Sequence, residues 1–106
     1  MTGLIVCTLI WTPSIDIERT YWKAYAYTQV GPHQGTCLDK LWHKESRWNP
    51  TAKNRNSTAR GIPQLLGLPK HLTPYQQIDR GLKYIEARYH GQPCQAWTHF
   101  KKRGWY

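Results

Sequence analysis

"TCLDKLWHKESRW", residues 36–48, combines a helical apolar pattern with an acid on the apolar side. Leu38, Leu41, Trp42 and Glu45 follow the i, i+3, i+4, i+7 spacing, so in a helix the four side chains share one face. An acid on that face either reaches solvent at the edge of the core or lies where desolvation favours its neutral form. A carboxyl group of the second kind stays partly protonated near neutral pH and can act as a general acid.

The segments on either side predict where this helix begins and ends. Thr36 is the predicted N-cap, and Asn49-Pro50 ends the helix because a residue before proline is pushed out of the α region. "GPHQG" (31–35) predicts a break, and the acidic start and aromatic pattern before it predict a first helix over residues 15–29.

The second half of the chain predicts a loop followed by two further helices. Residues 49–74 are rich in Asn, Ser, Thr, Gly and Pro, which is typical of an ordered functional loop in a compact domain. A helix over 73–89 has Thr73 as its cap and Pro74 at its first position, and Gly81 on its apolar stripe predicts a close approach of another element. A last helix is predicted over 94–102, ending at Gly104. A single, mainly α domain with a loop-rich segment between its helices follows.

Charge and composition favour an anionic polymer as the partner. The chain has 106 residues, a net charge of +9, six Trp and seven Tyr. The charge attracts nucleic acid, an anionic membrane surface or the acidic polymers of a bacterial wall, and aromatic side chains beyond those of the core are platforms for sugars or bases. "GLIVCTLIW" (3–11) is too short to span a membrane, which needs about 20 apolar residues.

The three cysteines leave two readings open. Cys37 and Cys94 begin two distant predicted helices, so a disulfide between them would join these helices, leave Cys7 unpaired and imply an oxidising compartment. In the other reading, all three are reduced thiols in a cytosolic protein.

Three blocks of the sequence together resemble the lytic transglycosylase domain of the lysozyme-like superfamily. These are "ESRWNPTAKNRNSTARGIPQL" (45–65), "TPYQQIDRGLKYI" (73–85) and "CQAWTHFKKRGWY" (94–106), the last being similar to the ending of small phage and Gram-positive domains. The resemblance covers residues 36–106 as a transglycosylase-like catalytic domain. Residues 1–35, an N-terminal extension and first helix, match weakly.

The resemblance implies roles for individual residues. Glu45 would be the sole acid and base, with Ser46 beside it. Gly61 would allow the chain to approach closely, and Gln64 and Tyr84 would face the sugars. Trp97 replaces a Tyr of the family as a stacking surface, and either Thr98 or His99 stands in for the Asn that follows it. No metal or cofactor is expected.

The carboxylates of the sequence fit a mechanism with one acid. Ordinary glycosidases place two carboxylates across one bond, but no second acid lies in residues 45–65, and Asp39 is about 600° around the helix from Glu45. One acid suffices where the N-acetyl group of the substrate stabilises the glycosyl cation. We therefore expect cleavage of peptidoglycan glycan strands with formation of 1,6-anhydromuramic acid.

Several alternatives have a basis in the same sequence. A hydrolytic muramidase would use the same Glu45, and a wall-binding or virion structural protein would keep the fold without activity. His43, Glu45 and Cys94 imitate a zinc deaminase pattern, but Trp97 occupies the position of its second cysteine. A nucleic-acid binder would use basic residues, although no recognised nucleic-acid signature is present; they are Lys53, Arg55, Arg60, Lys101, Lys102 and Arg103.

The expected place of action is the bacterial cell wall, outside the cytoplasmic membrane. No Lys or Arg precedes the apolar segment at residues 3–11 and no small-residue cleavage site follows it, so a signal peptide is not expected. This absence favours a phage-encoded lysin or virion component, with virion or tail proteins as further partners.

Overall fold

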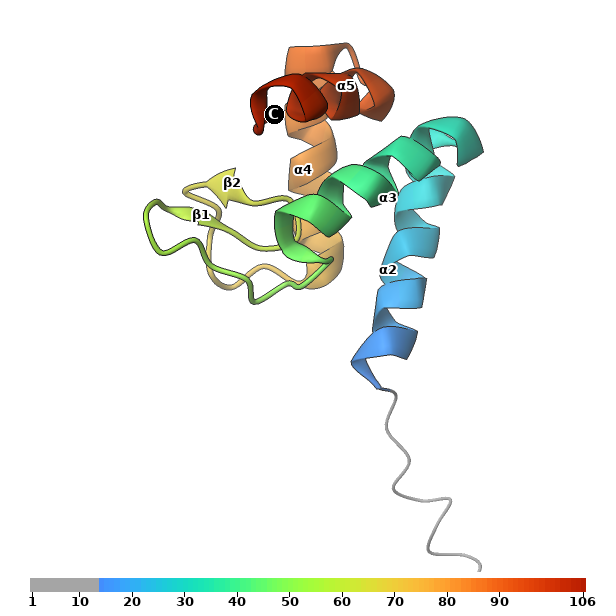
Figure 1. Cartoon of the computed structure of the whole chain (residues 1–106). Helices are drawn as coiled ribbons and strands as arrows, with labels where there is room; N and C mark the ends of the chain where they lie inside the picture. The colour runs from blue at the N-terminus through green and yellow to red at the C-terminus, as the bar shows by residue number, and fades with distance from the viewer. Residues whose placement is uncertain (1–13) are drawn as a thin grey trace, which may run out of the picture.

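The computed structural model describes residues 14–106 and shows a mainly helical chain, as the sequence predicts (Figure 1). Within this part of the chain, four helices and one short antiparallel hairpin alternate with loops. The elements are α2 (Ile15–Val30), α3 (Pro32–Ser46), β1 (Ala59–Arg60), β2 (Leu65–Leu66), α4 (Pro74–Tyr89) and α5 (Pro93–Arg103).

The predicted start of the Glu45 helix is wrong by five residues, since the N-cap is Gly31 and not Thr36. The helix begins at Pro32, because Gly31 alone makes the break with α2 through its positive φ of 86° and Pro32 then occupies the first helical position, where no N–H is needed. Thr36 is therefore inside α3 and not its cap, and its Oγ1 donates to the main-chain oxygen of Pro32 at 3.0 Å. The prediction of a first helix is confirmed by α2, which Ser14 caps.

The C-terminal end of α3 is fixed by two residues in the left-handed conformation. Arg47 and Trp48 have φ values of 56° and 59°, and they turn the chain away from the helix axis. The Trp48 ring returns to the core, where its Nε1 donates to the Asp39 carboxylate at 2.9 Å. This turn leads into the loop-rich segment, and the C-terminal end of α3 lies beside the hairpin in Figure 1.

A buried glutamine of α4 holds the loop between α3 and α4. Gln77 accepts a hydrogen bond from the Ile62 N–H at 2.9 Å and donates through Nε2 to the main-chain oxygens of Pro50 and Leu72. The β1–β2 pairing within this loop is antiparallel, with Ala59 opposite Leu66. These bonds give the predicted loop a defined path without long strands.

Helix α3 lies at the centre of the core, with α2 and α5 packed against it. The close approach predicted at Gly81 is present, since a Cβ there would lie 2.5 Å from Trp42 and 2.8 Å from Pro63. The buried core cluster draws on α2, α3, α4, α5, the loops after α3 and the last residue; it contains Trp22, Ala26, Leu38, Leu41, Trp42, Trp48, Ile62, Ile78, Ile85, Tyr89, Ala96 and Tyr106. The weakly matched region of the sequence, residues 1–35, ends inside α3. Helix α2, which belongs to that region, contributes Trp22 and Ala26 to the same core as the rest of the described chain.

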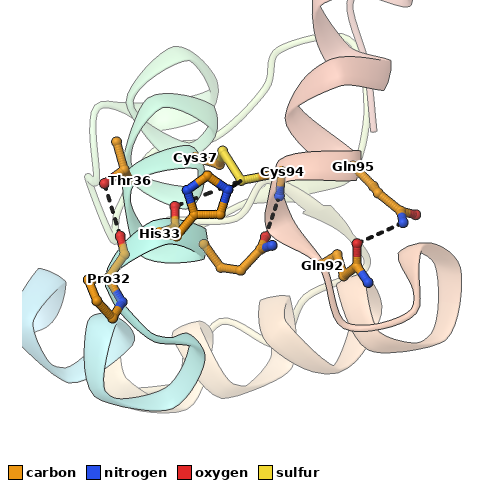
Figure 2. Close-up of a disulfide and its surroundings, with 8 residues drawn as sticks. Pro32, His33, Thr36, Cys37, Gln92, Cys94 and Gln95 are labelled. Carbon is orange, nitrogen blue, oxygen red and sulfur yellow. Dashed lines mark hydrogen bonds between the residues drawn. A yellow bond between two sulfur atoms is a disulfide. The ribbon is translucent and has the colours of Figure 1, made fainter.

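A disulfide joins α3 to α5, as Figure 2 shows. It connects Cys37 and Cys94, the pair considered from the sequence, and the Cys94 N–H donates to Oε1 of Gln34 at 2.8 Å. Helix α5 extends one residue beyond each end of the predicted 94–102 range and is capped by Gly104. Cys7, expected to be unpaired, lies outside the described residues. Of the helices at residues 14–106, none is long and apolar enough to cross a membrane.

Candidate functional site

A pocket of about 390 Å³ opens at the C-terminal turn of α3. Its walls come from four parts of the chain that are distant in sequence: α3, the β2 region, α4 and the last two residues. The lining residues are Glu45, Gln64, Leu65, Leu66, Tyr84, Trp105 and Tyr106. Three of the residues that the sequence assigns to the site, Glu45, Gln64 and Tyr84, are therefore brought together.

The Glu45 carboxyl group is half-buried in this pocket, and burial raises its pKa from 4.5 to about 7. No neighbouring charge contributes to this shift, because desolvation is its one cause. At neutral pH a large share of the Glu45 side chains therefore carries a proton. The group can donate that proton to a ligand and then act as a base.

Gln64 is held at the pocket in an unusual backbone conformation. Its φ of 52° is in the left-handed region, which is uncommon for residues other than glycine. The side chain stabilises this turn, because Nε2 donates to the main-chain oxygens of Gly61 at 2.9 Å and Ala52 at 3.2 Å. Both hydrogen bonds use the amide nitrogen, which leaves the amide oxygen for a ligand donor.

Two tyrosines, Tyr84 and Tyr106, form part of the pocket wall. The Tyr84 hydroxyl donates to the main-chain oxygen of Tyr106 at 2.6 Å, and the two rings meet edge to face with centroids 5.5 Å apart. The buried Tyr106 hydroxyl donates to the main-chain oxygen of Pro63 at 2.6 Å and accepts from Nε1 of Trp42 at 2.9 Å. Both hydroxyl protons are committed to main-chain oxygens, so neither tyrosine donates to Glu45.

Trp105 forms the open edge of the pocket. Half of its surface is exposed, which leaves an aromatic face for a ligand. His99 lies against it with ring centroids 4.4 Å apart, and the Arg88 guanidinium lies 5.1 Å from its ring. His99, a residue that the resemblance assigns to sugar contact, is absent from the pocket lining and packs against Trp105 instead.

Ser46 and Gly61 lie near the pocket but serve its framework. The Ser46 hydroxyl donates to the main-chain oxygen of Ile62 at 2.7 Å and so ties the end of α3 to the loop. Gly61 is buried with a φ of 79°, and a Cβ there would lie 2.6 Å from Oε1 of Gln77 and 2.7 Å from Leu68. Position 61 therefore requires glycine because the protein's own Gln77 and Leu68 side chains approach it closely.

Trp97 does not reach Glu45. It lines a second pocket with Lys23, Asp39, Lys40, His43 and Lys44. Lys40, His43 and Lys44 belong to α3, and they lie about 100–160° around the helix axis from Glu45, at 100° per residue. The position in α5 that resembles the stacking residue of the family therefore faces another side of α3.

Four lining residues were not singled out from the sequence: Leu65, Leu66, Trp105 and Tyr106. The ending "GWY" (104–106) was part of the resemblance, but no spacing in the sequence indicates that it returns to α3. The Trp42 and Tyr106 hydrogen bond, which makes this return specific, joins residues 64 positions apart.

Glu45 is the one Asp or Glu side chain that lines its pocket. All six Asp and Glu residues of the sequence lie within the described range. Asp16 pairs with Arg19, Asp39 pairs with Lys23, and Asp79 accepts from the Tyr25 hydroxyl. Glu18 and Glu86 belong to α2 and α4 and are absent from the lining.

The zinc pattern considered from the sequence has no matching arrangement. Cys94 is bonded to Cys37, so its sulfur is not a thiolate ligand. Across residues 14–106, no three His, Cys, Asp or Glu side chains gather as a metal site would require.

Comparisons of the chain with protein-family models, with curated proteins and with solved structures find no match. A functional proposal therefore rests on the sequence motifs and on the chemistry of the Glu45 pocket.

Proposed function

We propose that this chain is a peptidoglycan lytic transglycosylase with a lysozyme-like fold, and that it cleaves the β-1,4 bond from N-acetylmuramic acid to N-acetylglucosamine. The observation that carries the proposal is the pairing of a single carboxyl group of raised pKa with a glycan-sized pocket of aromatic and apolar walls. Glycan-cleaving enzymes need such a proton donor, and sugar rings pack on aromatic faces.

The proposed first step is proton transfer from Glu45 to the oxygen that joins the two sugars. The bond between C1 of the muramic acid residue and this oxygen breaks, and the glucosamine leaves with a free 4-hydroxyl group. The carbonyl oxygen of the substrate's N-acetyl group stabilises the positive charge that forms at C1. This role is assigned to the substrate because no second Asp or Glu lines the pocket.

In the second step, the Glu45 carboxylate removes the proton from the C6 hydroxyl of the same muramic acid residue. The C6 oxygen then bonds to C1, which closes the 1,6-anhydro ring and returns Glu45 to its protonated form. Water is not consumed. The tethered hydroxyl has an advantage in effective concentration over free water, and Leu65, Leu66 and Trp105 give the pocket apolar walls.

The amide oxygen of Gln64 is placed to accept a hydrogen bond from the sugar, and Trp105 offers a surface for a ring at the pocket edge. The partners in this proposal are glycan strands, and the place of action is the bacterial cell wall. A phage-encoded lysin or a virion component is the proposed origin.

Mass spectrometry of digested sacculi tests this proposal. We expect muropeptides with 1,6-anhydro ends, about 18 Da lighter than hydrolysed products because no water is added, and these products should be silent in a reducing-end assay. Hydrated, reducible ends would replace the transglycosylase with a muramidase using the same Glu45. If folded protein binds sacculi and releases nothing, the chain is a wall-binding protein.

A further inference from the structure

We infer that the pocket around Trp97 is a second binding site, which takes an anionic segment of the wall polymer while Glu45 acts on a glycan strand elsewhere. The inference rests on the proposed function for the identity of the polymer. The pocket has a volume of about 320 Å³, and its lining residues are Lys23, Asp39, Lys40, His43, Lys44 and Trp97.

The charge of this pocket is positive and largely uncompensated. Its single acid, Asp39, is already held by Lys23 Nζ at 3.2 Å and by Trp48 Nε1 at 2.9 Å. Lys40 and Lys44 are exposed, and within residues 14–106 neither forms an ion pair. Two free ammonium groups on adjacent turns of α3 therefore face whatever enters the pocket.

Trp97 gives the pocket an apolar wall beside these charges. The side chain is half-buried, and its ring stacks on Phe100 with centroids 5.9 Å apart and an interplanar angle of 13°. Lys101 Nζ lies 5.5 Å from the Trp97 ring and adds a further cation at the rim. A ligand that combines carboxylate or phosphate groups with the C–H surface of a sugar or an alkyl chain matches this combination.

The position of the pocket separates it from the Glu45 site. The arc of α3 that carries Asp39, Lys40, His43 and Lys44 is centred about 170° from Glu45, at 100° per residue. The two pockets therefore open on opposite sides of one rigid helix. A network of strands surrounds the enzyme on all sides, so the second site would hold it at the wall and raise the effective concentration of strands at the first.

The shape of the pocket favours a wall polymer over single-stranded nucleic acid. Proteins that bind single strands usually combine a long basic groove with several aromatic side chains on which successive bases stack. Trp97 is the one Trp, Tyr or Phe that lines this recess, with His43 as a smaller ring beside it. The anionic chemistry is shared by two wall sources, the carboxylates of peptide stems and the phosphates of polyol-phosphate polymers.

NMR titration of the full chain, observing the indole N–H of Trp97, tests the site directly. One probe is the disaccharide pentapeptide GlcNAc-MurNAc-peptide, which lacks the bond that the enzyme would cut. The second probe is poly(glycerol phosphate). The third, which represents single-stranded nucleic acid, is an oligothymidylate of twelve nucleotides, and all three are used at the same ionic strength. We expect a saturable shift of the Trp97 signal with the first or second probe, and the tighter of the two identifies the source.

A matched pair of variants separates local binding from net charge. Lys40→Gln/Lys101→Gln and Lys70→Gln/Lys83→Gln remove the same charge, the second pair from exposed positions outside the pocket. We expect the first pair to weaken probe binding at least fivefold and the control pair to change it less than twofold. An unchanged Trp97 signal, equal losses in both pairs, or tighter binding of the oligothymidylate would overturn the inference.

Cleavage of sacculi is measured in parallel on the same samples. Intact cleavage with an unchanged Trp97 signal overturns the second site and leaves the proposed function standing. A Trp97 shift with no cleavage supports the anion site and removes the proposed enzymatic function.

Discussion

Trp42 Nε1 donates a 2.9 Å hydrogen bond to the hydroxyl of Tyr106, which lies 64 positions further along the chain. The same hydroxyl donates to the main-chain oxygen of Pro63 at 2.6 Å, and the Tyr84 hydroxyl donates to the main-chain oxygen of Tyr106. Through its side-chain hydroxyl and its main-chain oxygen, Tyr106 thus connects α3, the hairpin loop and α4. This connection places Trp105 and Tyr106 as a wall of the pocket that contains Glu45.

Tyr106→Phe should destabilise the protein, because it leaves the buried N–H of Trp42 and the oxygen of Pro63 without a partner. We expect a loss of about 1–3 kcal/mol in the free energy of unfolding, measured by urea titration. Tyr21→Phe, which removes an exposed hydroxyl, is the control and should change stability by less than about 0.5 kcal/mol. Equal effects of the two substitutions would show that the Tyr106 hydroxyl does not organise the pocket wall.

Glu45→Gln should abolish wall cleavage and preserve the fold. The amide keeps the size of the carboxyl group but cannot donate and recover a proton, so the rate of muropeptide release should fall at least ~100-fold. Glu86→Gln removes an exposed acid of α4 and serves as the control. If folded Glu45→Gln protein keeps more than a tenth of wild-type activity, Glu45 is not the acid.

The activity should decrease as the pH rises through about 7. The first proposed step needs protonated Glu45, and burial raises the pKa of this group to about 7. Above that pH, the protonated share falls tenfold per unit, and kcat/KM on a soluble glycan fragment should follow it. An activity that stays level from pH 6 to pH 9, with the fold intact by circular dichroism, would contradict the assignment of Glu45 as the general acid.

Glu45→Gln should also stabilise the protein above pH 7 relative to the wild type. The folded state binds the Glu45 proton more tightly than the unfolded state. The contribution of Glu45 to the free energy of unfolding therefore falls from pH 4.5 to about pH 7 and is then constant. The full shift corresponds to about 3 kcal/mol, which solvent screening of the partly exposed group reduces to on the order of 1 kcal/mol. Thermal melts at pH 5 and pH 8 test this, and a gain that is equal at both values would refute it.

Removal of the disulfide should lower stability strongly. Cys37 and Cys94 are 57 positions apart, and closing a loop of that length contributes ~4 kcal/mol on the chain-entropy model. We expect the Cys37→Ala/Cys94→Ala variant to lose most of this amount in urea titration, while Cys7→Ala changes little. Thiol counting of the denatured, unreduced protein should find one free cysteine. Three free thiols would mean that the bridge does not form in the isolated protein.

The sequence alone predicted the elements whose signals are local. Thr73 and Pro74 mark the start of α4, and in the structure Thr73 is the cap, with Gln76 completing a reciprocal pair of hydrogen bonds. The apolar spacing of α3 placed Leu38, Leu41 and Trp42 in the core and Glu45 at its edge. The start of α3 differs from the prediction because Gly31 and Pro32 are typical of loops, although a proline at the first turn of a helix costs no hydrogen bond.

Only the tertiary structure decided which side chains meet at the pocket. Trp97 and Trp105 are both aromatic residues near the end of the chain, yet Trp105 lines the Glu45 pocket and Trp97 lines the pocket on the other side of α3. The choice depends on how α5 packs across α3, which the disulfide from Cys37 to Cys94 and the Tyr106 hydrogen bonds fix. Periodicity determines the face of a helix on which a residue lies, whereas contacts between distant segments determine what that face meets.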